Sequence, residues 1–273
     1  MQKTFDTPGP TSLYVELGSG DLSIRAEDVT TTTVNVDGKT ADDVIVELRG
    51  SQIVVLASQR RTGFFAGSND LSVSVTLPSD SELSTKLGSA DLDAAGRLGT
   101  AKIKSGSGDV QLDQLAGDAV VETGSGDIQI DSVTGDLRIK SGSGDIEVDR
   151  LGGAATISTG SGDVEIGTAQ GSVQVKSGSG DMRVREAHSD LALSTASGDL
   201  AVGRMHRGSL QAKNVSGDIH VGIPAGVPVW TDIGAVTGSV SSNLEGAGQP
   251  EEGQDFIEVR AKTVSGDILL EQL

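Results

Sequence analysis

The sequence predicts an all-β protein: a parallel β-solenoid, or β-helix, with 18-residue coils made of two nine-residue units, and an antiparallel β cap formed by the N-terminal part. Three observations predict this fold. A phrase that reads Ser-Gly-Ser-Gly-Asp recurs at a constant step, apolar and polar residues alternate after each copy, and glycine makes up 38 of the 273 residues. That share of glycine is roughly double the usual one.

The period is set by the aspartate that closes each phrase. Successive copies lie 18 residues apart, at Asp91, Asp109, Asp127, Asp145, Asp163, Asp181 and Asp199, and Asp218 follows after 19. Asp118, Asp136 and Asp190 lie halfway between copies, so the unit has nine residues and two units make one coil. Short units at a constant period cannot bury a face alone and must stack on their neighbours.

Each aspartate is followed by a strand of about five residues with one apolar face. Apolar residues stand one and three places after it, as in Ile146 and Val148, and polar residues such as Glu147 stand between them. This alternation predicts a strand that is buried on one side. A further apolar residue, six places after the aspartate, is expected to point inward at a wide corner of each coil: Leu115, Val133, Leu151, Ala169, Ala187 and Met205.

The recurring phrase itself forms a narrow corner, the turn that precedes each of these strands. A positive φ or a close approach of two backbones is needed at each passage of this corner, so we expect structural glycines there. They are Gly108, Gly126, Gly144, Gly162, Gly180 and Gly198. The Ser hydroxyl can bond a main-chain group or the serine one coil away, and the Asp carboxylate can accept from corner N–H groups.

We expect one structural domain with three continuous regions and no linker. Residues 91–221 hold the regular coils. Residues 1–90 hold a first coil, marked by an early copy of the phrase, and alternating strands with a turn at Arg49-Gly50 that form the β cap over the end of the solenoid. Residues 222–273 hold degenerate C-terminal coils and a cap.

These features together resemble the bacterial putative-adhesin family of β-strand-repeat domains, also called toastrack. The resemblance is carried by the SGSGD lattice, the VTLP strand before it, the IPAGVPV segment and the closing VSGDI, and it covers nearly the whole chain. It implies a right-handed, non-catalytic solenoid from a family of largely unknown function, often met alongside membrane proteins of the cell-envelope stress response. It supplies no catalytic residues.

The charge balance disfavours several classes of partner. With 39 acidic and 21 basic residues the net charge is −18, which argues against nucleic acid and acidic membrane surfaces, since both attract Lys and Arg. We find no secretory signal and no apolar run of about 18 residues. We therefore expect no direct membrane insertion and a cytoplasmic protein, with envelope association as the alternative. The chain has no Cys, and we expect no cofactor.

A ladder of aspartates is the first candidate site. The carboxylates of Asp109, Asp127, Asp145, Asp163, Asp181 and Asp199 are expected to stack one strand spacing apart. Like charges at that distance repel by about 1 kcal/mol per pair in water, and calcium between coils would relieve the repulsion. Calcium-binding nonapeptide solenoids, however, place glycine and aspartate differently (G-G-x-G-x-D-x-U-x). We therefore predict corner caps and no metal site, and keep an ion ladder as the alternative.

The outward strand faces are the second candidate site. One face carries Asp113, Asp131, Glu147, Asp149 and Glu165 and turns basic at Arg183 and Arg185, and the other carries Lys102, Lys104, Arg138, Lys140, Lys176 and Lys213 with Glu122. Flat faces of opposite charge suit side-by-side self-association or a protein partner. Simple solvation of both faces is the alternative.

The third candidate site is the segment 59–70, which concentrates basic and aromatic residues in an acidic chain with few rings. Arg60, Arg61, Phe64 and Phe65 are the candidate contact residues for a partner. The alternative is that this segment folds over the end of the solenoid as a plug.

The sequence does not indicate an enzyme. His188, His206 and His220 are scattered through separate coils, and we find no nucleophile elbow, zinc-ligand spacing or phosphate-binding loop. We therefore predict a non-catalytic scaffold or protein-interaction module, with an unknown protein partner or with self-association through its faces or ends. The resemblance links it to envelope stress or surface processes. A calcium-dependent binding or assembly protein is the alternative, and a carbohydrate-active β-helix enzyme is a remote one.

Overall fold

The computed structural model describes residues 1–57, 71–245 and 256–273. The chain divides into two compact units, Met1–Asp136 and Leu137–Leu273, which are taken in turn below. The expected division of one domain into the regions 1–90, 91–221 and 222–273 stays a prediction. Within the described ranges, no helix is long and apolar enough to span a bilayer.

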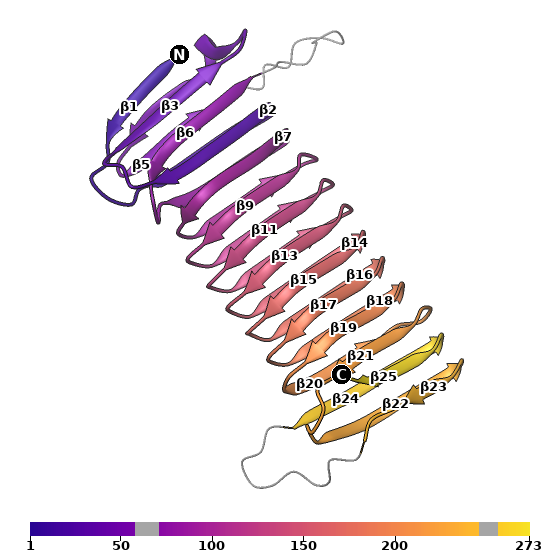
Figure 1. Cartoon of the computed structure of the whole chain (residues 1–273). Helices are drawn as coiled ribbons and strands as arrows, with labels where there is room; N and C mark the ends of the chain where they lie inside the picture. Colours follow the sequence, from indigo (N-terminus) through magenta and orange to yellow (C-terminus); the bar gives the residue numbers. More distant parts are fainter. Residues whose placement is uncertain (58–70, 246–255) are drawn as a thin grey trace, which may run out of the picture. The chain divides into compact units, whose positions relative to one another are not determined.

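The first unit consists of β-strands and a short 3-10 helix in its described part. Its elements are β1 (Gln2–Asp6), β2 (Ser12–Glu27), β3 (Thr31–Asp37), η1 (Ala41–Asp43), β4 (Ile45–Arg49), β5 (Gln52–Leu56), β6 (Ser72–Pro78), β7 (Glu82–Leu98), β8 (Ala101–Ser105), β9 (Val110–Leu115), β10 (Ala119–Thr123) and β11 (Ile128–Val133). Figure 1 shows β1, β3, β6, β2 and β7 side by side at the indigo end of the chain.

An early coil stacks on the regular lattice of this unit. The long strand β2 runs parallel to β7, with Gly20 opposite Ala90 and Asp21 opposite Asp91, so the first copy of the phrase occupies a regular corner position. From β7 onward the partners are 18 residues apart, as in Leu92 opposite Val110, except after a one-residue register shift between Ala94 and Arg97. The residues between β2 and β7 are therefore an insertion between two adjacent coils.

This insertion builds the antiparallel cap. β5 and β6 lie parallel to the outer side of β2, and β3 then pairs antiparallel with β6, and β1 with β3. β4 and β5 form an antiparallel hairpin at the predicted Arg49-Gly50 turn, where Gly50 has a φ of 63°. The predicted all-β solenoid with an N-terminal antiparallel cap is confirmed.

The second unit is also built from strands in its described part. They are β12 (Leu137–Ser141), β13 (Ile146–Leu151), β14 (Ala155–Ser161), β15 (Val164–Ala169), β16 (Val173–Ser179), β17 (Met182–Ala187), β18 (Leu191–Ser197), β19 (Leu200–Met205), β20 (Gly208–Lys213), β21 (Ile219–Ile223), β22 (Val229–Thr237), β23 (Val240–Ser242), β24 (Ile257–Ser265) and β25 (Ile268–Gln272).

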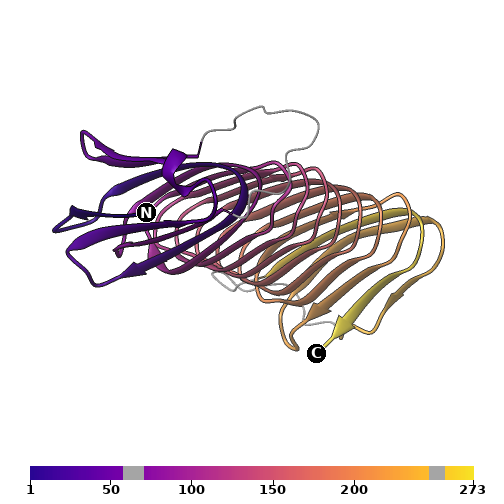
Figure 2. The same cartoon turned by 90° about the horizontal axis from the view of Figure 1, so that it is seen from above.

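Even-numbered and odd-numbered strands of this unit form two parallel stacks, joined at the corners into successive turns of a coil (Figure 2). From β12 to β19 the partners are again 18 residues apart, as in Ile139 opposite Ile157 and Val148 opposite Ile166. These inward residues are buried, as are the predicted apolar residues of the wide corners, such as Ala187 and Met205. The core is therefore a column of aliphatic side chains between the two stacks.

The order of the last coils differs from the order of the chain. β24 pairs with β20 on one side and with β22 on the other, and β25 lies in the same way between β21 and β23. The C-terminal segment therefore inserts between two coils that precede it in sequence. A coil between two others must fill the core, and the inward residues Ile257, Val259 and Ile268 of this segment do so with no exposed surface.

A hydrogen bond inside the phrase holds the narrow corners that open with Thr123, Ser141, Thr159, Ser177 and Thr195. The hydroxyl that opens the phrase donates to the carbonyl two residues later, as from Thr159 to Ser161 at 2.8 Å and from Ser177 to Ser179 at 2.7 Å. Among the six corner glycines, five have a positive φ and the sixth, Gly108, does not. A Cβ atom on Gly108 would still lie 2.0 Å from the carbonyl oxygen of Ala90.

Replacing a corner glycine should destabilise the fold. Gly162 has a φ of 108°, and a Cβ atom there would lie 2.2 Å from the carbonyl oxygen of Gly144. We expect Gly162→Ala to lower the free energy of unfolding by about 1–3 kcal/mol, because the two coils must separate or the backbone must change conformation. Urea unfolding followed by circular dichroism measures this.

Gly234→Ala is the matched control, since a Cβ atom on Gly234 meets no atom within 4 Å. Its effect should stay within about 0.5 kcal/mol. Equal losses in the two variants would contradict the packing argument.

Candidate functional site

The predicted aspartate ladder is a chain of hydrogen bonds between successive coils. In the first unit, Oδ1 of Asp91 accepts from the backbone N–H of Asp109, and Oδ1 of Asp109 accepts from that of Asp127, both at 2.9 Å. In the second unit the same bond, at 2.7–2.8 Å, links Asp145 to Asp163, Asp163 to Asp181, Asp181 to Asp199, Asp199 to Asp218, and Asp218 to Asp267. Each rung thus binds its carboxylate to a partial positive charge on the next coil.

The last rung of the ladder is bound most completely. Asp267 accepts from the backbone N–H of Ser239 at 2.7 Å. This bond, together with the Ser239 side chain, holds the pKa of the Asp267 carboxyl below its ordinary value of 3.8. The ladder aspartates are all exposed, so their charges are also screened by solvent. The absence of a metal site stays the prediction for this ladder, and calcium binding stays the alternative.

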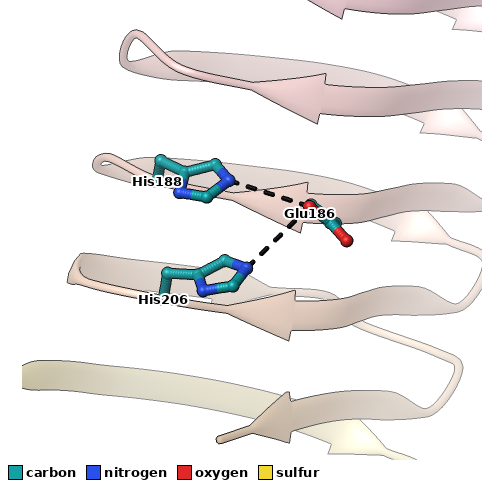
Figure 3. A group of neighbouring side chains, drawn as sticks. All are labelled: Glu186, His188 and His206. Carbon is teal, nitrogen blue, oxygen red and sulfur yellow. Dashed lines mark ion pairs between the residues drawn. The ribbon is translucent and has the colours of Figure 1, made fainter.

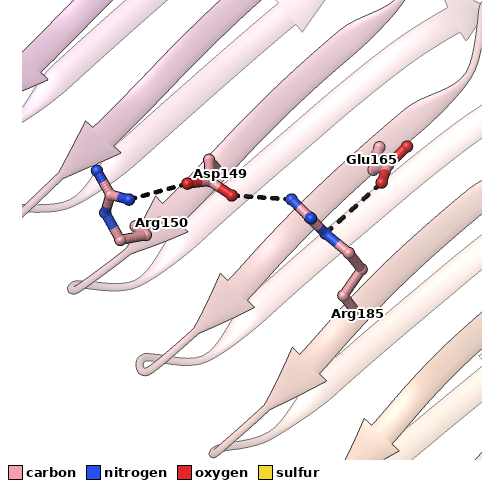
Figure 4. A network of polar contacts seen from close by, with 4 residues as sticks. All are labelled: Asp149, Arg150, Glu165 and Arg185. Atoms are coloured by element: carbon pink, nitrogen blue, oxygen red, sulfur yellow. Dashed lines mark hydrogen bonds and ion pairs between the residues drawn. The ribbon is translucent and has the colours of Figure 1, made fainter.

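The outward faces carry ion pairs that cross from coil to coil. Arg185 on β17 donates to Asp149 on β13 at 2.8 Å and lies 3.6 Å from Glu165, while Arg150 lies 3.0 Å from Asp149 (Figure 4). In the first unit, Lys104 on β8 lies 2.8 Å from Glu122 on β10, in the next coil.

Arg185 reaches a carboxylate two coils away because the intervening position is Gly167. A Cβ atom there would lie 2.7 Å from both the guanidinium and the Asp149 carboxylate. The acidic and basic patches predicted from the sequence therefore partly neutralise each other within this unit.

The third predicted site, Arg60, Arg61, Phe64 and Phe65, lies outside the described residues.

A cluster that sequence reasoning missed lies at the wide corner after β17 and β19. His188 follows Ala187, and His206 follows Met205, its partner in the next coil. The two imidazole rings stack with their centroids 4.2 Å apart and their planes 6° apart. Nε2 of His188 lies 3.7 Å, and Nε2 of His206 3.9 Å, from the same carboxylate oxygen of Glu186 (Figure 3).

The expectation that the histidines are scattered is therefore wrong for two of the three. His188 and His206 are 18 residues apart, which is one coil, and that spacing was available in the sequence. His220 lies elsewhere and contacts Glu271 at 3.0 Å.

The cluster is partly buried and its charges are coupled. Burial lowers the pKa of His206 below its ordinary value of 6.5, and the neighbouring His188 lowers it further, whereas Glu186 acts in the opposite direction. Nε2 of His206 is buried and has no hydrogen-bond partner among the described residues.

The second unit also has an open end, formed by β22 and β23. Within the described part of the chain, β22 pairs only with β24 and β23 only with β25. Side chains on this last coil are largely exposed, with Val236 at 79 %, Trp230 at 51 % and Val240 at 45 %. Arg260 on β24 lies over the Trp230 ring, 5.6 Å from its centroid.

The coils, the corner phrase and the ladder define the class of protein as a β-solenoid of the toastrack type. The chain belongs to the Toastrack DUF4097 family, whose profile matches residues 10–171 and again 154–271. No curated protein matches the chain.

Several solved structures are similar along nearly their whole length. A putative lipid binding protein from Parabacteroides distasonis shares 18 % identity and a TM-score of 0.47, with 98 % of this chain and 96 % of that chain covered. A putative adhesin from Bacteroides fragilis shares 11 % identity and a TM-score of 0.42, with 99 % and 96 % covered. A putative adhesin from Parabacteroides merdae shares 12 % identity and a TM-score of 0.29, with 99 % and 95 % covered.

Removing the charge of Asp267 should lower the free energy of unfolding at neutral pH but not in acid. A carboxylate whose pKa is lowered in the native state stabilises that state above the ordinary value of 3.8, and the contribution is lost as the pH falls through the lowered value. We expect Asp267→Asn to unfold at a lower urea concentration than the parent protein at neutral pH, and the difference to shrink in acid.

The comparison variant is Asp93→Asn, an exposed aspartate of β7 that accepts no backbone N–H within the described residues. It should show little difference at any pH. A difference between Asp267→Asn and the parent that grows as the pH falls would contradict the assignment.

The Arg185 network should contribute little to stability. The side chains of Arg185 and Asp149 are 52 % and 43 % exposed, and such pairs are weakened by solvent and by the entropy of ordering long side chains. A double-mutant cycle with Arg185→Gln and Asp149→Asn should give a coupling energy of about 0.2–1 kcal/mol. A much larger coupling energy would show that these side chains form a structural network.

Proposed function

We propose that this protein is a non-catalytic binding scaffold that associates through the open end of its C-terminal coil, with a second copy of the same chain as the occupant. The open end of β22 and β23 is the observation that carries this proposal. The ladder supports a structural role for the repeated acidic residues, because their oxygens are used to hold the backbone of the next coil.

At the open end, the positions that face the core are exposed or half-buried, whereas the equivalent positions in the neighbouring coil of β24 and β25 are buried. Val259 and Ala261 on β24 are fully buried. Their partners on β22 are not: Thr231 is exposed and Ile233 is half-buried. Val240, the partner of the fully buried Ile268, is 45 % exposed. One further layer of strands would remove this apolar surface from water.

The backbone of the open end is also suited to adding a strand. An edge strand presents a row of N–H and C=O groups that can pair with an extended segment of another chain. In a two-fold arrangement, β22 of one copy would lie antiparallel to β22 of the other, so a single surface serves as both partners.

The charge distribution favours a second copy at this end over side-by-side contact. Asp232 is the only charged residue in β22 and β23, and Lys262 lies 3.1 Å from it. The strand faces of a chain with a net charge of −18, in contrast, bring many carboxylates with them. Repulsion between two copies is therefore smaller at the open end than between two strand faces.

Sedimentation velocity over a range of protein and salt concentrations tests this proposal. The parent protein should form dimers as its concentration rises, and the dimers should persist at high salt, because apolar burial and backbone pairing carry the contact. Val240→Lys should shift the protein to monomer, since it places a charge at an inward position of the contact.

Val215→Lys is the matched control, because Val215 is 54 % exposed but lies outside β22 and β23. It should leave the dimer intact. A parent protein that is monomeric at every concentration would overturn the proposal. Dimers that dissociate at high salt and are unaffected by Val240→Lys would also overturn it, because they would point to the charged strand faces.

A further inference from the structure

We propose that Glu186, His188 and His206 form a binding site for a divalent transition-metal ion of the zinc class. Two imidazoles and one carboxylate from the ends of β17 and β19 are brought to one place by the stacking of successive coils (Figure 3). This site lies on other strands than the proposed docking end and does not depend on it.

The ligand atoms are close enough to close around one ion. All three lie within 4.8 Å of one another, and the two contacts to Glu186 are 3.7 and 3.9 Å. In a tetrahedral zinc site with bonds of about 2.0–2.1 Å, neighbouring ligand atoms are about 3.3 Å apart. Binding therefore requires the two stacked rings to tilt and the carboxylate to move closer. The distances between the ligand atoms must shorten by about 0.4 to 1.5 Å.

The surroundings allow this movement. The side chains of His188, His206 and Glu186 are 26 %, 33 % and 45 % exposed, so part of each side chain faces solvent and can move without displacing core residues. The backbones, in contrast, are fixed: the N–H of His188 donates to Ala169 at 2.9 Å and that of His206 to Ala187 at 2.8 Å. A rigid frame thus holds adjustable ligands, and a zinc ion bound by three protein ligands takes a water molecule as its fourth ligand.

The kind of ion follows from the ligands. Imidazole nitrogens suit zinc, copper and nickel, whereas calcium and magnesium take oxygen ligands. The cluster differs in this respect from the aspartate ladder, which offers oxygen alone. The buried Nε2 of His206, which has no hydrogen-bond partner among the described residues, would gain a ligand bond in the process.

Two cations nearby work against the ion. Arg204 lies opposite Glu186 in the register of β17 and β19, and Arg207 donates to the carbonyl of His188 at 2.8 Å. Their charges oppose a divalent ion, so the single carboxylate is needed to offset them. Loss of the Glu186 charge should therefore weaken binding as strongly as loss of an imidazole.

An ion at this place would join two consecutive coils outside the core. It binds the ends of β17 and β19 to each other, and any ligand that binds only the native state raises the melting temperature. Zinc should therefore stabilise the protein against heat in a concentration-dependent way.

Isothermal titration of the full chain with zinc chloride tests the site. We expect one ion per chain, and binding at least about tenfold weaker in His188→Gln, His206→Gln and Glu186→Gln, since even outer-shell changes cost about 10–100-fold. His220→Gln is the matched control, because His220 also contacts a glutamate but stands alone. It should bind zinc like the parent protein.

A second measurement does not rely on variants. In NMR spectra of the parent protein, zinc should shift the ring signals of His188 and His206 and leave those of His220 unchanged. Calcium chloride in place of zinc should shift none of the three.

The proposal is overturned if zinc produces no heat, if the ratio is one ion per two chains, or if His220→Gln weakens binding as much as His206→Gln does. It is also overturned if all three histidines shift equally, since that would indicate binding to exposed imidazoles in general.

Discussion

Stacking in register is the constraint on which the rest of this structure depends. Each residue of a regular coil lies about 4.8 Å from the residue 18 positions away, so its main neighbour is another copy of its own position. At the narrow corner this leaves room for a glycine but not for a Cβ atom, as at Gly162 and Gly180. It also places a carboxylate where it can accept from the N–H of the next coil. The repetition of the phrase is therefore a packing requirement.

The same constraint governs the charges. If the repeat were exact, a side chain on an outward face would lie beside an identical side chain in each adjacent coil. Like charges one strand spacing apart repel each other. The ladder relieves this with hydrogen bonds to backbone N–H groups, and the outer face relieves it with Arg185, which reaches past Gly167 to Asp149. Where two histidines occupy equivalent positions, the outcome is a stacked pair beside one carboxylate.

Much of the fold can be predicted from the sequence, because in a repeat with a constant period the spacing along the chain also determines which residues are in contact. The inward residues, the corners and the cap hairpin at Gly50 were all predictable from alternation and spacing. The placement of β24 between β20 and β22 was not, since the order of coils depends on which segment can fill a core on both sides. The pairing of His188 with His206 was missed because motif searches compare residues along the chain, and not at equal positions in successive coils.

The insertion of the C-terminal segment changes what the segment before it must do. A coil with neighbours on both sides needs apolar residues at every inward position, as Ile257, Val259 and Ala261 provide. The coil of β22 and β23 has one neighbour in the described structure, so its inward positions include Thr231 and the exposed Val240. Because β24 and β25 lie between two coils, the last coil, β22 and β23, does not need apolar residues at every inward position. This end has a free strand edge, partly apolar side chains and a single paired charge. It is the part of this unit where residues can be used for a contact surface with the least loss of core packing.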